Sequence, residues 1–204
     1  VNVPTSYLAN EPAVMRARHC HYDPIKQIHY RLRALTANGH QPTKIELIII
    51  GGTWSYLPKK YQYWYIANCY AAANTYGKTA RRYRQNLSLD QLKKAIAKEQ
   101  TINESTRYRI VGLTLETRPD CLTPQELTRL REFGCTRVEI GVQIVDDHIL
   151  RLNERTTTVQ DIAQATQLLR DWGFKITYHI MPALPGSNPD HDIAMYKKLF
   201  TDPR

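Results

Sequence analysis

Short apolar runs alternate along this chain with longer stretches in which apolar residues recur at helical spacing. Four of these runs are rich in β-branched residues, and they predict strands at residues 45–50, 110–115, 137–142 and 175–180. Alternation of this kind is typical of parallel strands joined by right-handed helical crossovers. We therefore expect an α/β fold built from four strand–helix units.

Capping residues mark where the intervening helices begin and end. Asp23 before Pro24 predicts a helix start, and Gly39 predicts its end. Further helices are predicted from Pro58 toward Gly77, from Ser88, from Thr123-Pro124 to Gly134, and over residues 147–152, 159–172 and 190–200. The run 45–50 is apolar except at Glu46, so we expect helices to cover this strand on both faces.

The composition indicates one folded domain. The chain has 204 residues, of which 42% are hydrophobic. Its longest apolar run, 45–50, is far shorter than the roughly 20 residues of a membrane-spanning helix, and no signal-like segment opens the chain, so membrane insertion and secretion are disfavoured. The four cysteines form no CxxC pair and indicate neither a disulfide framework nor a local metal site, which fits a reducing, cytosolic setting. They are Cys20, Cys69, Cys121 and Cys135.

The charge balance points to a polyanionic partner. Lys and Arg number 28 against 19 Asp and Glu, a formal charge of +9, which favours a nucleic acid or a phosphate-bearing cofactor. A basic connector with Lys78, Arg81, Arg82 and Arg84 is a candidate phosphate contact, with a solvated loop as the alternative. The tyrosine-rich stretch 61–76 could stack on bases, but its helical spacing favours packing on the sheet.

Polar residues follow two of the predicted strands at their carboxyl ends, where the loops of α/β barrels build their sites. The Gly-Gly-Thr sequence at 51–53 either lets backbone groups approach a polar ligand or forms a tight turn. After the second strand come Glu116, Arg118 and Asp120. They either present a ligand-binding carboxylate or form an internal network of ion pairs.

The third and fourth strands carry further candidates. Glu139 and Gln143 are four residues apart, so they face the same side of a strand. A mid-strand glutamate needs a cation or donors; Arg137 on the same face is the default partner, and a ligand or a basic residue on an adjoining strand is the alternative. His179 near the end of the fourth strand is well placed for function, although a lone histidine there is more often structural. The His-Cys-His triplet at 19–21 favours loop structure over metal binding, because adjacent side chains diverge.

Several short motifs follow one another at specific spacing along nearly the whole chain. In order they are PTSY at 4–7, EP at 11–12, MRA at 15–17, YDP at 22–24, GGT at 51–53, ETRPD at 116–120, GCTR at 134–137, EIGVQ at 139–143 and HIMP at 179–182. On these motifs the chain resembles the family of catalytic subunits of the Elongator complex. It is similar there to the radical S-adenosylmethionine (SAM) domain of a tRNA wobble-uridine modifying enzyme.

The resemblance implies an incomplete TIM-like (βα)6 barrel with parallel strands. In this family three cysteines in a loop after the first strand hold a 4Fe–4S cluster, and that loop lies just upstream of the segment that matches residues 4–7. Since the chain begins with Val1, we expect residues 1–204 to be a radical SAM core fragment. It would lack the first strand with the cluster loop, the last unit and the C-terminal acetyltransferase domain. No cysteine present takes a ligand position, so the fragment itself is expected to be inactive.

The family also implies a reaction for the intact parent protein. A radical formed from SAM abstracts hydrogen from the methyl group of acetyl-CoA, and the carbon radical adds to C5 of the wobble uridine to give carboxymethyluridine. By analogy, the implied SAM residues are Gly51, Gly52 and Thr53 at the methionine amino group, with Glu116 assisting, Gln143 at the ribose, and His179 to Leu184 beside the adenine. Lys44 matches a family lysine associated with acetyl-CoA; the alternative is a surface lysine before a strand.

Several arginines match the family as well. Arg16, Arg118 and Arg155 would line the barrel mouth or meet tRNA phosphates, in addition to the connector arginines. The family's Asn-Arg-Gly-His-Thr-Val motif is replaced at 154–159 by Glu-Arg-Thr-Thr-Thr-Val, so a role of that histidine is not supported. The resemblance implies tRNA as a partner and a cytoplasmic location, and it leaves open whether Elongator-type accessory subunits take part.

Two alternatives are kept. One is another radical SAM enzyme, of the methylthiotransferase or porphyrin-pathway type, because strand-end glycines and a Glu-Gly-Gln pattern recur across that superfamily. The other is a module that binds tRNA without chemistry, favoured by the charge of +9 and the missing cluster loop. Loss of the first strand would expose the edge at 45–50, and we expect this edge to promote association.

Overall fold

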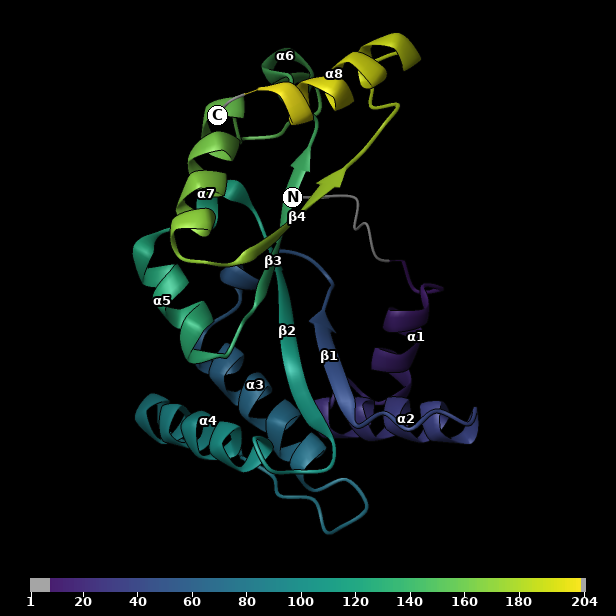
Figure 1. Cartoon of the computed structure of the whole chain (residues 1–204), viewed down its shortest axis with the longest axis vertical. Helices are drawn as coiled ribbons and strands as arrows, with labels where there is room; N and C mark the ends of the chain where they lie inside the picture. Colours follow the sequence, from purple (N-terminus) through teal and green to yellow (C-terminus); the bar gives the residue numbers. More distant parts are fainter. Residues whose placement is uncertain (1–7, 203–204) are drawn as a thin grey trace.

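The computed structural model describes residues 8–202, so the motif at 4–7 lies outside the described residues. Its central sheet has four strands that all run in the same direction (Figure 1). They are β1 (Lys44–Ile49), β2 (Arg109–Thr117), β3 (Arg137–Gln143) and β4 (Lys175–Ile180), in the order β1-β2-β3-β4. Each neighbouring pair is parallel, so every connection crosses back to the amino end of the next strand. The predicted parallel α/β fold is confirmed.

The helices begin at the capping residues expected from the sequence. At α2 the Asp23 side chain accepts the Lys26 N–H at 3.0 Å, and at α4 Ser88 and Gln91 form a capping box. The helices are α1 (Pro12–His19), α2 (Pro24–Ala37), α3 (Lys59–Asn74), α4 (Leu89–Asn103), α5 (Pro124–Glu132), α6 (Asp147–Leu152), α7 (Val159–Asp171) and α8 (Pro189–Thr201), with short 3-10 turns η1 (Trp54–Tyr56) and η2 (Pro119–Cys121). Of these, α1 and both 3-10 turns were not predicted.

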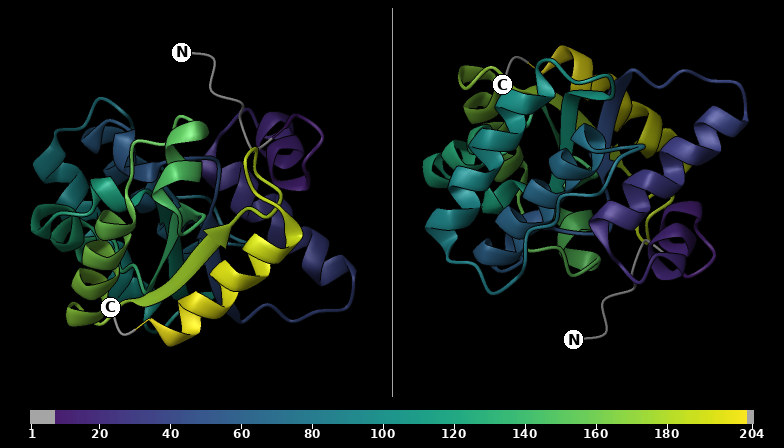
Figure 2. Two further views of the ribbon diagram at one scale, coloured as in Figure 1. Left: turned by 90° about the horizontal axis from the view of Figure 1, so that it is seen from above. Right: turned by 90° about the horizontal axis from the view of Figure 1, so that it is seen from below.

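Helices α3, α4, α5 and α7 gather on one side of the sheet (Figure 2). In β3, Val138, Ile140 and Val142 are fully buried in the core beneath these helices. The residues between them are half-exposed on the opposite face, which we call the open face. The sheet therefore presents one apolar face to the helices and one accessible face, on which alternate residues of each strand lie.

Strand β1 departs from the expectation of helices on both faces, which is wrong. Its residues alternate between half-buried and exposed, and Ile48 is 46% exposed. The physical reason is that Ile48 lies on the open face of the sheet; β1 also lies at the edge of the described sheet, where it pairs with β2. An isoleucine-rich run therefore marks a strand here without proving that the strand is central.

The tyrosine-rich helix packs on the sheet, as its spacing predicted. In α3, Tyr63, Trp64 and Tyr70 are buried, and the Tyr63 ring meets Phe133 edge-on with ring centroids 4.8 Å apart. The Trp54 ring of η1 also meets Phe133 edge-on, with ring centroids 6.1 Å apart. Within residues 8–202 no helix combines the length and apolar character needed to cross a membrane.

Candidate functional site

Three ionisable side chains from three adjacent strands meet on the open face of the sheet. Glu116 of β2 and Glu139 of β3 are direct partners in the strand register. His179 of β4 contacts both: its Nε2 lies 2.8 Å from Glu139 Oε2, and its Nδ1 lies 3.4 Å from Glu116 Oε1. The side chains of Glu116, Glu139 and His179 are 14%, 13% and 32% exposed. The register therefore brings two of the predicted SAM residues, Glu116 and His179, into direct contact and adds Glu139 as a third member of the cluster.

Arg137 is not the partner of Glu139, so the default pairing expected from the sequence is wrong. The Arg137 guanidinium lies 3.6 Å from a carboxylate oxygen of Glu46 on β1. Glu46 stands opposite Gly112 of β2, the strand that lies between Glu46 and Arg137. The alternative that Glu139 pairs with a basic residue on an adjoining strand, here His179, is the one the structure shows.

The turn after β1 consists of two glycines in conformations that other residues rarely adopt. Gly51 has a φ of 129° and Gly52 a φ of 116°. A Cβ at either position would meet nothing within 4 Å, so the backbone is open on that side. Thr53 follows directly and precedes η1. An accessible backbone at a strand end suits close approach by a small polar ligand.

Gln143 ends β3 with a φ of 68°, an unusual left-handed conformation for a residue with a side chain. Its amide Nε2 lies 2.9 Å from where a Cβ of residue 141 would be, so Gly141 makes room for it. The Met181 N–H donates to the Gln143 carbonyl at 2.8 Å, which ties the ends of β3 and β4 together. Glu139, Gly141 and Gln143 thus lie in one row on the open face, as their spacing predicted.

The loop after β2 holds an internal ion pair. The Arg118 guanidinium donates to both carboxylate oxygens of Asp120, at 3.0 and 2.6 Å, and also to the Thr156 hydroxyl. It lies 5.6 Å from the ring centre of Tyr56. The sequence allowed either a ligand-binding carboxylate or an internal network of ion pairs in this loop. Arg118 and Asp120 form the internal network. Through Thr156, Arg118 also links this loop to the segment that carries the half-buried Arg155.

The basic connector between α3 and α4 is anchored by a buried carboxylate. Glu99 has no exposed side-chain surface, and it accepts hydrogen bonds from Arg81 at 2.6 Å and from the Tyr83 hydroxyl at 2.7 Å. The Asn74 amide donates to it at 2.8 Å. Burial alone would raise the pKa of Glu99, but these hydrogen bonds from Tyr83, Arg81 and Asn74 hold it below its usual value.

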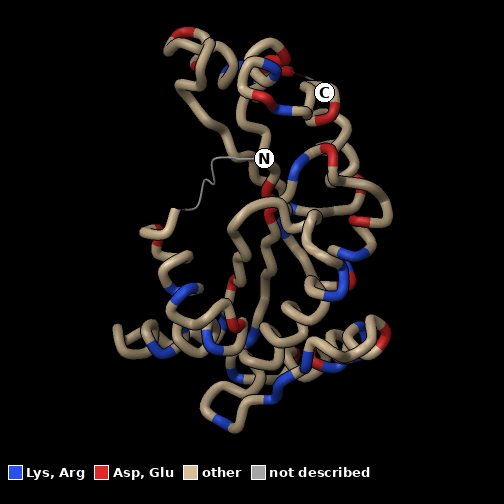
Figure 3. Tube along the Cα trace, turned by 180° about the vertical axis from the view of Figure 1, so that it is seen from behind, with Lys and Arg blue, Asp and Glu red and all other residues tan. Residues whose placement is uncertain are grey.

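Five of the six predicted nucleic-acid arginines fall into two groups, and Arg16 on α1 belongs to neither. Arg82 pairs with Asp23 at 2.7 Å and Arg84 is exposed, and their connector lies by the amino ends of the strands, at the bottom of Figure 1. Arg118 and Arg155 belong to loops at the opposite, carboxyl end. Figure 3 shows the same division, with basic residues on the lower helices and connector and around the upper loops.

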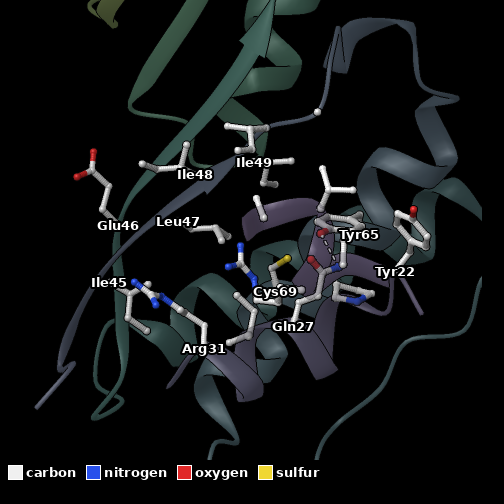
Figure 4. Close-up of a pocket in the computed structure, with 18 of the residues that line it drawn as sticks. Tyr22, Gln27, Arg31, Ile45, Glu46, Leu47, Ile48, Ile49, Tyr65 and Cys69 are labelled. Carbon is white, nitrogen blue, oxygen red and sulfur yellow. Dashed lines mark hydrogen bonds between the residues drawn. The ribbon is translucent and has the colours of Figure 1, made fainter. Parts of the chain in front are cut away.

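A groove of about 830 Å³ runs along β1 between this strand and helices α1, α2 and α3 (Figure 4). Arg16 and Arg31 line it, and the Gly51 turn borders one end and Lys44 the other. Since a strand rises about 3.3 Å per residue, Lys44 lies about 20 Å from the Gly51 turn. The structure therefore does not bring Lys44 to the cluster of Glu116, Glu139 and His179.

A second polar cluster was missed by sequence reasoning. His191 of α8 lies 3.3 Å from Asp146 through Nε2 and 3.1 Å from the Ser187 hydroxyl through Nδ1. The backbone N–H of Ile149 is the main cause of a lowered pKa at Asp146, with His191 contributing. This cluster joins the loop after β3 to the start of α8. No sequence spacing indicates it, because its residues are 45 positions apart.

The four cysteines do not form a metal site. Cys20, Cys69 and Cys135 are buried and Cys121 is half-buried, and all are free thiols. Burial raises the pKa of Cys69 and raises that of Cys135 to about 12, which disfavours the thiolate form that binds metals. Across the described part of the chain, no group of three His, Cys, Asp or Glu side chains could hold a metal ion.

Comparison with known proteins agrees with this fold. The model of the Radical SAM superfamily matches residues 26–199. A solved structure of the archaeal Methanocaldococcus infernus Elp3 with an N-terminal deletion superposes with a TM-score of 0.79 at 39% identity, over 92% of this chain and 40% of that one. The chain belongs to the Radical SAM superfamily.

Named relatives confirm the resemblance to the Elongator family. A tRNA uridine(34) acetyltransferase of Dehalococcoides mccartyi is 46% identical over 98% of this chain, and Elongator complex protein 3 of Schizosaccharomyces pombe is 37% identical over 97%. The chain spans 40% of the first relative's length and 34% of the second's.

This superfamily implies two bound groups, SAM and a 4Fe–4S cluster, and the residues present fit SAM. SAM carries a cationic amino group and polar ribose hydroxyls, and the open Gly51–Gly52 backbone, the Glu116 carboxylate and the Gln143 amide suit them. A 4Fe–4S cluster needs thiolate ligands in one place, and the dispersed, buried cysteines of this chain do not fit it.

Proposed function

We propose that this chain is the SAM-binding barrel of an enzyme that modifies uridine 34 of tRNA. The single observation that carries the proposal is the convergence of strand ends: the Gly51 turn, Glu116, Gln143 and His179 all lie toward the carboxyl ends of adjacent parallel strands. In α/β barrels this edge forms the site. The names of the relatives supply the substrate.

Each residue has a role that its chemistry supports. The backbone at Gly51, Gly52 and Thr53 receives the methionine amino group, and the Glu116 carboxylate stabilises its positive charge. The Gln143 amide hydrogen-bonds the ribose. His179 and the segment up to Leu184 lie beside the adenine. When bound in enzymes of this superfamily, SAM supplies radical chemistry, and the protein binds, orients and shields it.

The finer chemistry is also part of the proposal. Acetyl-CoA provides the carbon unit that becomes 5-carboxymethyluridine, and the Lys44 ammonium, at the far end of the groove, contacts a phosphate of that ligand rather than its acetyl group. Arg16, Arg118 and Arg155, with connector arginines 81, 82 and 84, contact tRNA phosphates. Accessory subunits of the Elongator type and a cytoplasmic location belong to the same proposal.

The cluster ligands come from residues outside this sequence, because the four cysteines present are dispersed and mostly buried. The 204-residue chain by itself is therefore inactive in SAM cleavage. Addition of iron and sulfide to this chain alone would leave SAM intact, and cleavage by the chain alone would contradict this part of the proposal.

The function is tested in the full-length protein, reconstituted anaerobically with iron and sulfide. With SAM, acetyl-CoA and tRNA, we expect 5′-deoxyadenosine and carboxymethyluridine at position 34. The substitution Glu116→Gln should greatly reduce the yield of both products. The substitution Glu46→Gln, which changes a glutamate in the neighbouring strand, should leave the yield unchanged. Tight tRNA binding without 5′-deoxyadenosine would instead identify a binding module without chemistry.

A further inference from the structure

We propose that Glu139 is a positioning residue, which acts through His179 to fix the Glu116 carboxylate for the amino group of SAM. The inference rests on the proposed SAM site. It adds a residue that touches no ligand, and it gives the cluster a direction: Glu139 holds His179, and His179 holds Glu116.

The two contacts of the ring are unequal, and this inequality sets the direction. His179 Nε2 is 2.8 Å from Glu139, within ordinary hydrogen-bonding distance, whereas Nδ1 is 3.4 Å from Glu116. The ring is thus anchored on Glu139 and reaches the Glu116 carboxylate more loosely. A carboxylate held in this way keeps an orientation and can still accept a second cationic partner.

The charges explain why the ring is needed. Glu116 and Glu139 are register partners on one sheet face, and like charges directly opposite each other destabilise a sheet. The imidazole hydrogen-bonds Glu139 and lies 3.4 Å from Glu116, so it separates the two carboxylates and offsets part of this repulsion.

Neighbouring cations do not replace His179. Arg137 lies on the same face but contacts Glu46 at 3.6 Å. Lys175 is the register partner of Arg137, two positions before the partner of Glu139. Among the residues that the structure describes, His179 is the ion-pair partner shown for Glu139.

Replacement Glu139→Gln keeps the size of the side chain and removes the anionic acceptor. The ring then loses its charged anchor and holds the Glu116 carboxylate less firmly. Loss of a residue that orients a metal ligand costs about ten- to a hundredfold in affinity, and by analogy we expect about a tenfold rise in the dissociation constant for SAM. Glu46→Gln is the matched control, because Glu46 is also a mid-strand glutamate of the same sheet paired with a basic residue.

The first test observes the ring directly. The full-length protein with ¹⁵N-labelled histidine is measured by NMR without ligand. We expect the Nε2 resonance of His179 to show its hydrogen bond to Glu139 in the wild type and in Glu46→Gln, and to shift in Glu139→Gln. The same His179 spectrum in all three proteins would overturn the inference.

The second test measures SAM binding by calorimetry to the reconstituted full-length protein. Weaker binding by Glu139→Gln, with Glu46→Gln like the wild type and all three proteins folded at the temperature of the measurement, supports the inference. Equal binding by all three proteins overturns it and leaves the proposed function intact. No SAM binding by the wild type overturns the proposed function and, with it, this inference.

Discussion

Glu116 and Glu139 stand opposite each other on neighbouring parallel strands, and the imidazole of His179 contacts both carboxylates. Two carboxylates this close on one sheet face repel each other, so the ring is part of what makes the arrangement stable. The cluster has consequences for stability that can be measured apart from any ligand.

Replacement His179→Leu should destabilise the protein by about 1–2 kcal/mol, because two half-buried carboxylates lose their shared partner. Urea unfolding measures this change. The double variant with Glu139→Gln should lose less than the sum of the two single changes, since the repulsion also falls. Strict additivity would show that His179 and Glu139 do not interact.

Glu99→Gln should lower the free energy of unfolding by about 2 kcal/mol at neutral pH, because a fully buried carboxylate accepts three hydrogen bonds. The folded pKa of Glu99 is lowered, so its contribution is present above the unfolded pKa and is lost as pH falls through the folded one. The difference in unfolding free energy between Glu99→Gln and the wild type should therefore shrink below about pH 4.

The control for Glu99 is Asp90→Asn, which removes an exposed ion pair with Lys94. This variant should unfold like the wild type at every pH, because exposed pairs contribute little. A pH-independent difference between Glu99→Gln and wild type would contradict the assigned role of the Glu99 charge.

Gly52→Ala should cost about 1 kcal/mol or more in stability, because its φ of 116° is strained for any residue with a Cβ. It should also weaken SAM binding, since the turn is proposed to hold the ligand. Gly112→Ala is the matched control: its φ is not positive and its new Cβ would make ordinary contacts at 3.4 Å and beyond. Equal effects of both substitutions would argue against a special Gly52 backbone.

Thiol labelling of the native chain should modify Cys121 fastest. Burial raises the pKa of all four thiols, so accessibility decides the order: Cys20, Cys69 and Cys135 are buried and Cys121 is half-buried. Mass spectrometry after brief alkylation measures the order. Rapid labelling of Cys69 without unfolding would contradict the packing of α3.

Among the described strands β1 pairs only with β2, and its other edge should make the isolated chain associate at high concentration. Ile48→Lys places a charge at an exposed position of that strand and should reduce association without unfolding the protein. Light scattering across a concentration series measures both. A wild-type chain that stays monomeric throughout would refute the edge-pairing prediction.

The strands and most helices could be predicted because their signals are local. Asp23, Ser88 and Thr123 each cap a helix through their own neighbours, and the apolar runs mark the strands. The exposure of Ile48 could not be predicted, because it depends on the place of β1 in the sheet. Helix α1 was missed because its opening resembled a polar turn.

The site could be predicted only in part, for a related reason. Glu116, Gln143 and His179 were singled out from their positions at strand ends, and their role in binding SAM stays a prediction. The contact between Glu139 and His179 depends on the register of β3 against β4, in which Glu139 pairs with Thr177. That register is a long-range property, and the nearby Arg137 offered a local partner that the fold directs elsewhere.

The most direct test of the central claim is a crystal structure of the reconstituted full-length protein with S-adenosylmethionine. We predict the methionine amino group at the Gly51–Thr53 backbone and the Glu116 carboxylate, with the ribose at Gln143. A ligand bound at the amino ends of the strands, beside Lys44 or the connector at Arg84, would contradict the account.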